Sequence, residues 1–568
     1  MKFRLPLLVL CLIATSFLLY IRRPYSLASD IAYQALSARQ YAEGLVPAVN
    51  SLRLVNPRDL SQDIQTSMTF WAPAWPYLFV AAFKAGLAPG PAGRTLAVLL
   101  SITGAMGWLW VISLIRLRGF WKIAGAVLAG LYCLRTGIVS SLGAGDLLIY
   151  AVAPWLLGAS FPIGERLRSG LDRRTAAQVT LLCLALGCVY WLKYSGIFLS
   201  LPVFCALQLA HLRARPRPAA LVAVLALSAT ALALPVLANR VYNYQKKGTD
   251  LMESAIPHSV PRTFTRLRRL SSDNIYYAST ILFSAEPGVM RAARDRSRTL
   301  DRVAHIPGVL LLIVFLYLLY RHPATYLRDL TALTLVIPLI GFPVLSFIAG
   351  MQFIVSIGRC CEPFWILAEL VILLLLSQPA NPTGAGIPTA TFVVAAAAGI
   401  QLLFLLWIPF SAVQDYLFMT YRRPPYQAGS ADLYVPDLSR FGTRKIDADV
   451  KSEIRGSSDV VAPATYSNRS FGVDLWIEFG GRLLPLTTFD APLTATHGKD
   501  GANFYGSAPF VTSRPLRVIL VASNVFERSD FEELVQHIKD RFIQAREWIR
   551  GPLDPDGRVQ IWVTDLEH

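Results

Sequence analysis

Apolar segments long enough to cross a membrane recur along this chain, and they constrain its fold more than any other feature. A helix that crosses a bilayer needs about 20 predominantly apolar residues. Segments of this kind lie near 5–21, 94–115, 121–138, 146–162, 177–192, 196–211, 219–238, 306–320, 330–349, 362–377 and 387–410. The sequence therefore predicts an α-helical polytopic membrane protein with about 11 transmembrane helices.

The charge of the chain supports the same class. Only 16% of the residues are charged, against about 25% in soluble domains, and the charge is missing in blocks. A net charge of +17 would suit nucleic acid, but the arginines lie mostly between apolar segments, where they set topology or bind phosphate. We therefore expect membrane lipids as partners and no nucleic acid; the sequence leaves the oligomeric state open.

Two N-terminal stretches need separate interpretation. Lys2 and Arg4 precede an apolar run that could be a signal peptide, but no small-x-small cleavage site directly follows it. We predict an uncleaved anchor with a cytoplasmic N-terminus. The stretch 68–87 is apolar but holds two prolines, six aromatic residues and a lysine, which favours an interfacial helix over a span.

The short loops then predict the orientation. The inner loops hold twelve basic residues and the short outer loops only two, Lys193 and Arg359; the twelve are Arg116, Arg118, Lys122, Arg166, Arg168, Arg173, Arg174, Arg213, Arg215, Arg217, Arg321 and Arg328. Basic residues favour the cytoplasmic side. We expect a protein of the cell (inner or plasma) membrane whose C-terminal domain is extracytoplasmic. If 68–87 were a span, the predicted orientation of everything after it would be inverted.

Two regions differ in composition. Residues 1–411 form the predicted membrane domain, with long outer loops at 22–67 and 239–304. Residues 412–568, the tail, have ordinary polarity. Their strand-like runs are Asp459–Ala462, Val473–Phe479, Arg517–Ala522 and Arg558–Thr564, and Asp530–Arg550 is helix-like. This pattern predicts a small soluble α/β domain.

Several ionisable residues fall at the outer mouth of the bundle in this topology: Asp30, Asp146, Lys193, Arg359 and Glu362. Charged residues near the membrane are costly, so a functional role is the first hypothesis. A carboxylate can act as general base, and fixed cations can stabilise charge that grows on a leaving phosphate.

Simpler interpretations remain open. Asp30 and Asp146 could cap the helices that they open, and Lys193 could extend to the interface. Glu362 could only pair with Arg359, Tyr33 could be an interface anchor, and Arg39 a solvated charge.

The long outer loop 239–304 is basic. It holds twelve basic and six acidic residues, and ten of the twelve are arginine, including Arg266, Arg268 and Arg269. Arginine binds phosphate through two hydrogen bonds at once, whereas lysine acts as a point charge. The loop is therefore a candidate phosphate clamp, or a nonselective site for anionic lipid headgroups.

The segment Ser29–Gly44 carries a pattern of its own. It contains Asp30, then Tyr33, Ala38-Arg39 and Glu43-Gly44. This order resembles the first-loop motif of the GT-C glycosyltransferases, which include the protein O-mannosyltransferases and the lipid A aminoarabinose transferase, except that Ser29 stands where the family has an acidic residue.

Five further positions resemble that family in the same order along residues 1–380. They are Ala72-Pro73-Ala74-Trp75-Pro76-Tyr77-Leu78, Arg94-Thr95-Leu96, Asp146-Leu147-Leu148, Lys193-Tyr194-Ser195-Gly196, and Arg359 with Pro363. At the last of these, Cys360 replaces the family's aromatic residue. Each motif is weak alone, but six in order on one side of the membrane indicate a GT-C-like domain.

This resemblance implies a glycosyltransferase that takes a sugar from a polyprenyl-phosphate carrier, with inversion at the anomeric carbon. Asp30 would be the base, and Asp146 a second acid that orients base or acceptor. Lys193, Arg359, Arg266, Arg268 and Arg269 would bind the donor phosphate, and Tyr33, Arg39 and Glu362 would position the substrates. We expect no cofactor, with a divalent metal left open. A flippase of lipid-linked glycans and a noncatalytic scaffold are the alternatives; the flippase is disfavoured because no internal repeat is found.

Overall fold

The computed structural model describes part of the chain. The described residues are 25–26, 29–56, 58–67, 71–87, 89–115, 144–245, 324–349, 427–428, 431–434, 452–465, 482–484, 509–523, 531–553 and 559–567, with separate residues between 312 and 320 and between 366 and 377. The predicted spans 5–21, 121–138 and 387–410 lie outside this part, so the total number of spans stays a prediction.

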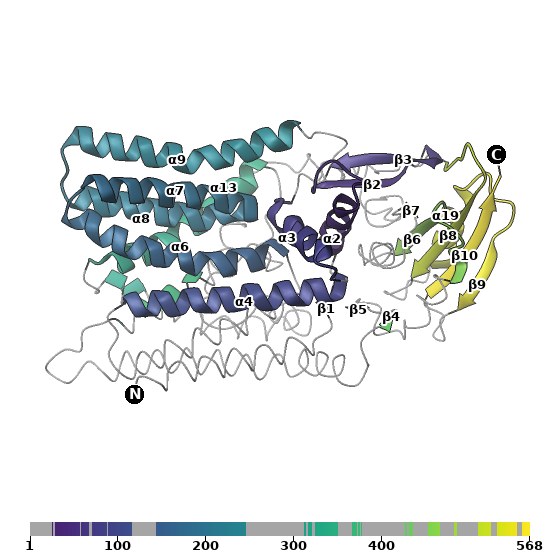
Figure 1. Cartoon of the computed structure of the whole chain (residues 1–568), viewed down its shortest axis with the longest axis horizontal. Coiled ribbons are helices and arrows are strands. Elements are labelled where there is room, and N and C mark those ends of the chain that lie inside the picture. The colour runs from purple at the N-terminus through teal and green to yellow at the C-terminus, as the bar shows by residue number, and fades with distance from the viewer. Residues whose placement is uncertain are drawn as a thin grey trace.

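A bundle of long helices lies to the left in Figure 1, with the sheet of the tail to the right. The bundle comprises α4 (Pro89–Leu114), α6 (Ala144–Ser169), α7 (Arg173–Leu192), α8 (Ile197–Arg213), α9 (Pro218–Gln245) and α13 (Tyr326–Ala349). Among the described residues, five helices are long and apolar enough to cross a membrane, and they coincide with the predicted spans near 94–115, 146–162, 177–192, 196–211 and 219–238. Helix α6 runs past the predicted end at 162 to Ser169, with Pro162 inside it.

Small residues let these helices approach closely. A Cβ atom at Gly187 of α7 would lie 2.3 Å from the carbonyl oxygen of Leu232 on α9. The backbones of α7 and α9 therefore touch where a larger residue would separate them, as is common between membrane helices.

One end of the bundle collects the basic residues predicted to be cytoplasmic. Arg213 at the end of α8 pairs with Asp329 at the start of α13, with 2.8 Å between Nη2 and Oδ1. Asp172 caps α7 by accepting the backbone N–H of Thr175, and its hydrogen bonds with Thr175 lower the pKa of that carboxyl group. The ion pair joins the ends of α8 and α13, and Nη1 of Arg166 on α6 donates to Oε1 of Gln178 on α7 at 2.7 Å.

The opposite end of the bundle carries α2 (Ser29–Ala42), α3 (Ala74–Lys84) and a hairpin of β2 (Ser51–Asn56) and β3 (Asp59–Ser67). The helix that Asp30 was expected to open in the first loop is α2. Helix α3 has 11 residues and is about 16 Å long, which is too short to cross a bilayer and agrees with leaving 68–87 out of the spans. The hairpin was not predicted.

The described part of the tail forms a five-stranded mixed sheet with the strand order β7-β6-β8-β10-β9. The strands are β6 (Val460–Thr465), β7 (Arg482–Leu483), β8 (Leu516–Ser523), β9 (Ile549–Leu553) and β10 (Val559–Leu566). Strand β6 is parallel to β7 and β8, and β10 is antiparallel to β8 and β9. The predicted runs at 459–462, 517–522 and 558–564 are strands; Val473–Phe479 lies outside the described residues.

The predicted helix over Asp530–Arg550 was too long. Helix α19 covers only Phe531–Asp540, and the chain then turns into β9. The ring of Phe542 packs 4.8 Å from that of Phe510 and 5.4 Å from that of Trp548, so the apolar residues after Asp540 serve the core of the tail rather than a longer helix.

A small three-stranded sheet joins the first outer loop to the start of the tail. Strand β1 (Tyr25–Ser26) lies parallel to β5 (Ala431–Tyr434), which pairs with β4 (Gln427–Ala428). The first outer loop and the start of the tail are therefore in direct contact.

Candidate functional site

The segments that carry the sequence motifs meet at one end of the bundle. Helix α2, helix α3, the start of α4 and the start of α6 share one apolar core, to which Tyr33, Leu36, Trp75, Ala97 and Leu147 belong. In Figure 1 this end lies between the bundle and the sheet of the tail. It is the end predicted to be the outer mouth.

Tyr33 anchors α2 to the segment before α3. Its side chain is 5% exposed, and its ring stacks on that of Trp71 with 6.3 Å between centroids. The hydroxyl of Tyr194 donates to the carbonyl oxygen of Trp71 at 3.3 Å. Two motif positions more than a hundred residues apart thus contact the same residue, and the burial of Tyr33 argues against a simple interface anchor.

Lys193 lies at the predicted break between two helices. Helix α7 ends at Leu192, a 3₁₀ turn (η1) covers Tyr194–Gly196, and α8 begins at Ile197. The turn needs a glycine, since a Cβ atom at Gly196 would lie 2.6 Å from Val189 Cγ1.

The same break brings Lys193 to the start of α6. A Cβ atom at Gly145 would lie 3.2 Å from both Cβ and Cγ of Lys193. The stem of Lys193 therefore lies against the residue that directly precedes Asp146, so the predicted second acid and a predicted cation come from adjoining backbone segments.

Both predicted acids lie in the first turn of a helix. Asp30 is the second residue of α2 and Asp146 the third residue of α6; their side chains are outside the described part. The positive end of the helix dipole stabilises a negative charge in the first turn. Such a position favours the ionised form, which a general base needs at neutral pH.

Arg39 is already engaged. It forms an ion pair with Glu43, directly after the end of α2, and the two side chains are 40% and 42% exposed. Its guanidinium carbon lies 5.9 Å from the centroid of the Phe83 ring on α3. These contacts give Arg39 a part in joining α2 to α3; its predicted role towards substrate stays a prediction.

The remaining predicted site residues are Arg359, Glu362, Arg266, Arg268 and Arg269, and they lie outside the described residues. Within the described ranges, no three His, Cys, Asp or Glu side chains gather as metal ligands would.

An aromatic cluster that the sequence did not reveal adjoins Lys193. The ring of Tyr190 lies 4.8 Å from that of Tyr194, and the guanidinium carbon of Arg240 lies 5.6 Å from the Tyr190 ring centroid. Of the twelve basic residues in 239–304, Arg240 alone is among the described residues. It adds a second cation near Lys193, held on an aromatic face.

The end of α9 joins this cluster to the first outer loop. The ring of Tyr242 lies 5.7 Å from that of Trp191, and its hydroxyl donates to Asn50 Oδ1 at 3.2 Å. Asn50 is 2% exposed, and its Nδ2 has no hydrogen-bond partner among the described residues.

We expect Tyr242→Phe to destabilise the protein by about 1–3 kcal/mol, because it leaves a buried amide with no partner for its oxygen. Thermal unfolding in nanodiscs measures the effect. The control is Tyr320→Phe, at a residue 79% exposed, which should unfold like the parent. Equal stability of the two variants would show that the Tyr242–Asn50 contact does not hold α9 to the loop.

No family model matches the chain, and no curated protein matches it in sequence. The search of solved structures does find likenesses. A crystal structure of ArnT from Cupriavidus metallidurans, bound to undecaprenyl phosphate, aligns at a TM-score of 0.48 with 11% identity over 98% of this chain and 97% of that one. A cryo-EM structure of the arabinofuranosyltransferase AftD from Mycobacteria aligns at 0.44 with 14% identity over 99% of this chain and 40% of that one.

With TM-scores below 0.5 and identities of 14% or less, these likenesses carry no argument about the fold, residue roles or substrate of this chain. A chemical role for the site has to rest on its own residues.

Proposed function

We propose that this protein is a membrane glycosyltransferase that moves a sugar from a polyprenyl-phosphate donor to an extracytoplasmic acceptor. One observation supports it most: motif positions far apart in the sequence converge at one end of the bundle, with Lys193 against the residue before Asp146 and with Tyr33 and Tyr194 both on Trp71. A scaffold has no need of this convergence of motif segments.

The residues divide by chemistry. Asp30 takes the proton of the acceptor hydroxyl, and Asp146 orients the acceptor. The sugar then moves to the acceptor oxygen while the polyprenyl phosphate departs with the electron pair of the broken bond. Lys193 stabilises the charge of the departing phosphate, assisted by Arg359.

A direct assay tests the proposal. The purified protein in nanodiscs is given polyprenyl-phosphate sugars with a radiolabelled sugar, together with a delipidated envelope extract as acceptor. We expect label to pass from the lipid fraction to the extract for one sugar of the panel, with release of polyprenyl phosphate. A panel in which every donor remains intact would overturn the proposal.

The arginines of the outer loop give a second test. Changing Arg266, Arg268 and Arg269 together to Gln should raise the KM for the donor more than the KM for the acceptor, since their phosphate contacts are lost. Added polyprenyl phosphate should also no longer protect the loop from protease. If donor KM and protection both match the parent, the cluster only binds lipid headgroups.

The proposed side of the membrane can be checked by labelling. Ser457 is exposed in the tail. In a background without native thiols, Ser457→Cys should react with an impermeant thiol reagent on intact cells. Labelling only after lysis would invert the predicted topology and move Asp30 to the cytoplasmic side.

A further inference from the structure

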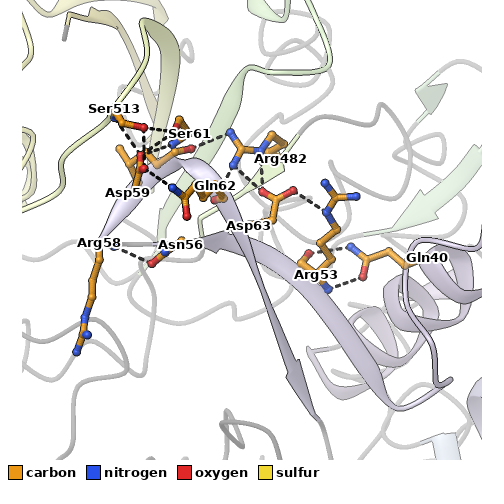
Figure 2. Close-up of polar contacts among 11 residues, drawn as sticks. Gln40, Arg53, Asn56, Arg58, Asp59, Ser61, Gln62, Asp63, Arg482 and Ser513 are labelled. Atoms are coloured by element: carbon orange, nitrogen blue, oxygen red, sulfur yellow. Dashed lines mark hydrogen bonds and ion pairs between the residues drawn. The ribbon is translucent and has the colours of Figure 1, made fainter.

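The carboxylate of Asp63 on β3 joins two arginines from distant parts of the chain (Figure 2). Its Oδ2 accepts from Nε of Arg53, on the neighbouring strand β2, at 2.6 Å. Its Oδ1 accepts from Nε and Nη2 of Arg482, in the tail, at 2.8 and 2.6 Å. The side chains of Asp63 and Arg482 are only 15% and 16% exposed.

Arg482 also binds the backbone of the hairpin. Its Nη1 donates to the carbonyl oxygen of Leu60 and its Nη2 to that of Gln62, both at 2.7 Å. One guanidinium group thus donates hydrogen bonds to a carboxylate and to two backbone carbonyl groups of one strand. Arginine holds its N–H donors in the fixed planar arrangement that this requires, and lysine does not.

A second anchor lies at the tip of the hairpin. Asp59 accepts from the backbone N–H and the hydroxyl of Ser513 at 3.0 and 2.7 Å, and the N–H of Leu60 donates to the carbonyl oxygen of Val511 at 2.8 Å. Desolvation raises the pKa of Asp59, but the hydrogen bonds from Ser513 and Ser61 outweigh it and hold the pKa well below its usual value. The anchor is therefore charged at neutral pH.

Apolar side chains of the hairpin and of the tail pack into shared cores. Val55 and Leu60 of the hairpin belong to the core of the tail, with Val460 and Phe510. Leu483 of the tail belongs to the core that contains Tyr33 of α2. The hairpin and the tail are thus packed as one unit.

The hairpin in turn is fixed to α2. Gln40 on α2 binds Arg53 through two backbone hydrogen bonds: its Nε2 donates to the carbonyl oxygen at 2.9 Å and its Oε1 accepts from the N–H at 2.8 Å. The hydroxyl of Ser37 donates to the carbonyl oxygen of Ser51 at 2.8 Å. A continuous series of contacts therefore runs from Arg482 through Asp63 and Arg53 to the helix that begins beside Asp30.

We propose that Arg482 is a positioning residue, through which the tail sets the placement of α2 and hence of Asp30. The inference rests on the function proposed above and gives the tail a part in it. Asp30 lies ten residues before Gln40 on α2, about 15 Å along a rigid helix, so a tilt at the Gln40 end displaces the base. A displacement of about 1 Å can lower a rate by about 10²-fold.

Arg482→Ala should therefore lower kcat by about 10–10²-fold and leave the KM for the donor unchanged, because the proposed phosphate ligands lie outside the tail. The control is Arg517→Ala, which removes an ion pair with Glu453 inside the tail, 2.6 Å between Nη2 and Oε2, away from the hairpin. It should reduce the stability of the tail while kcat stays near that of the parent.

A reversible crosslink separates positioning from general damage. The hydroxyl oxygens of Ser61 and Ser513 lie 2.7 Å apart, close enough for a disulfide between cysteines. In an Arg482→Ala background without native thiols, Ser61→Cys with Ser513→Cys should restore kcat when oxidised and lose it when reduced. A formed crosslink that restores nothing would overturn the proposal, as would an Arg482→Ala enzyme with normal kcat.

A distance measurement keeps the test independent of activity. Spin labels at Leu45→Cys, just after α2, and Val241→Cys, exposed on α9, report the placement of α2 on the bundle. We expect one narrow distance distribution in the parent and a broader or shifted one in Arg482→Ala. An unchanged distance distribution in Arg482→Ala contradicts the positioning proposal, whether or not sugar transfer is found. A changed distribution, together with a parent protein that transfers no sugar, counts against the glycosyltransferase function alone.

Discussion

Asp30→Asn is expected to lower the rate of sugar transfer by about 10²–10⁴-fold, the usual effect of losing a general base. The amide has nearly the same shape but cannot accept the proton of the acceptor hydroxyl. Residue 30 lies in the first turn of α2, where the helix dipole favours the carboxylate, so some loss of helix stability is also expected. That loss is small beside the kinetic effect, at about 0.3–1 kcal/mol.

The measurement compares transfer rates at matched amounts of folded, inserted protein. Glu533→Gln is the control, because it removes one carboxylate from an exposed position on α19 far from the proposed site. A rate within about threefold of the parent for Asp30→Asn would rule out the base assignment, since it is far below the expected loss. It would leave the helix-capping role of Asp30 as the better interpretation.

Lys193→Ala should lower kcat by about 10²–10³-fold, the typical cost of removing one fixed group that stabilises transition-state charge. Cβ and Cγ of Lys193 lie close to Gly145, so the side chain leaves the backbone beside the start of α6. A fixed cation stabilises the departing phosphate more than the bound donor, because negative charge grows there during transfer. The effect should therefore fall mainly on kcat.

Lys84→Ala is the matched control for this change. Lys84 is exposed in the last turn of α3, at the same end of the molecule, so its loss removes the same charge without touching the proposed site. If the two alanine variants have equal kcat, Lys193 only extends to the membrane interface, and the donor phosphate has to be held by arginines alone.

The membrane helices could be predicted from the sequence for a simple physical reason. The thickness of a bilayer requires about 20 apolar residues in each spanning helix, and a run of that length is visible directly in the sequence. The break at Lys193–Gly196 was equally visible, since a polar residue and a glycine interrupt an apolar run. The stretch 68–87 was kept out of the spans because of its prolines, aromatic residues and lysine, and the 11-residue helix α3 lies there, directly after Pro73.

The hairpin β2–β3 had a weaker local signal. Leu52 and Leu54 alternate with polar residues, and Asn56-Pro57-Arg58-Asp59 is a turn sequence, so its strands could have been found. Its role could not. The residues that complete it are Arg482 and Ser513, 419 and 454 positions from Asp63 and Asp59, and no pattern along the chain links them.

The same limit applies to the aromatic cluster at the mouth. Tyr242 fell in the predicted outer loop 239–304, and Asn50 in the predicted outer loop 22–67. Their contact joins residues 192 positions apart. Length and periodicity reveal each element alone, whereas the side chains that connect elements depend on how the helices pack.

The central claim is that a lipid-linked sugar is consumed at the outer face of the membrane. The most direct test is to deplete the protein in its source cells, treat intact cells with membrane-impermeant periodate to oxidise exposed sugars, and extract the polyprenyl-phosphate sugars. We predict that one such lipid accumulates, that periodate destroys it in intact cells, and that the parent protein, but not Asp30→Asn, returns it to its normal level. The claim would be contradicted if no such lipid accumulated. It would also be contradicted if periodate destroyed the accumulated lipid only after lysis, which is the result expected from the loss of a flippase.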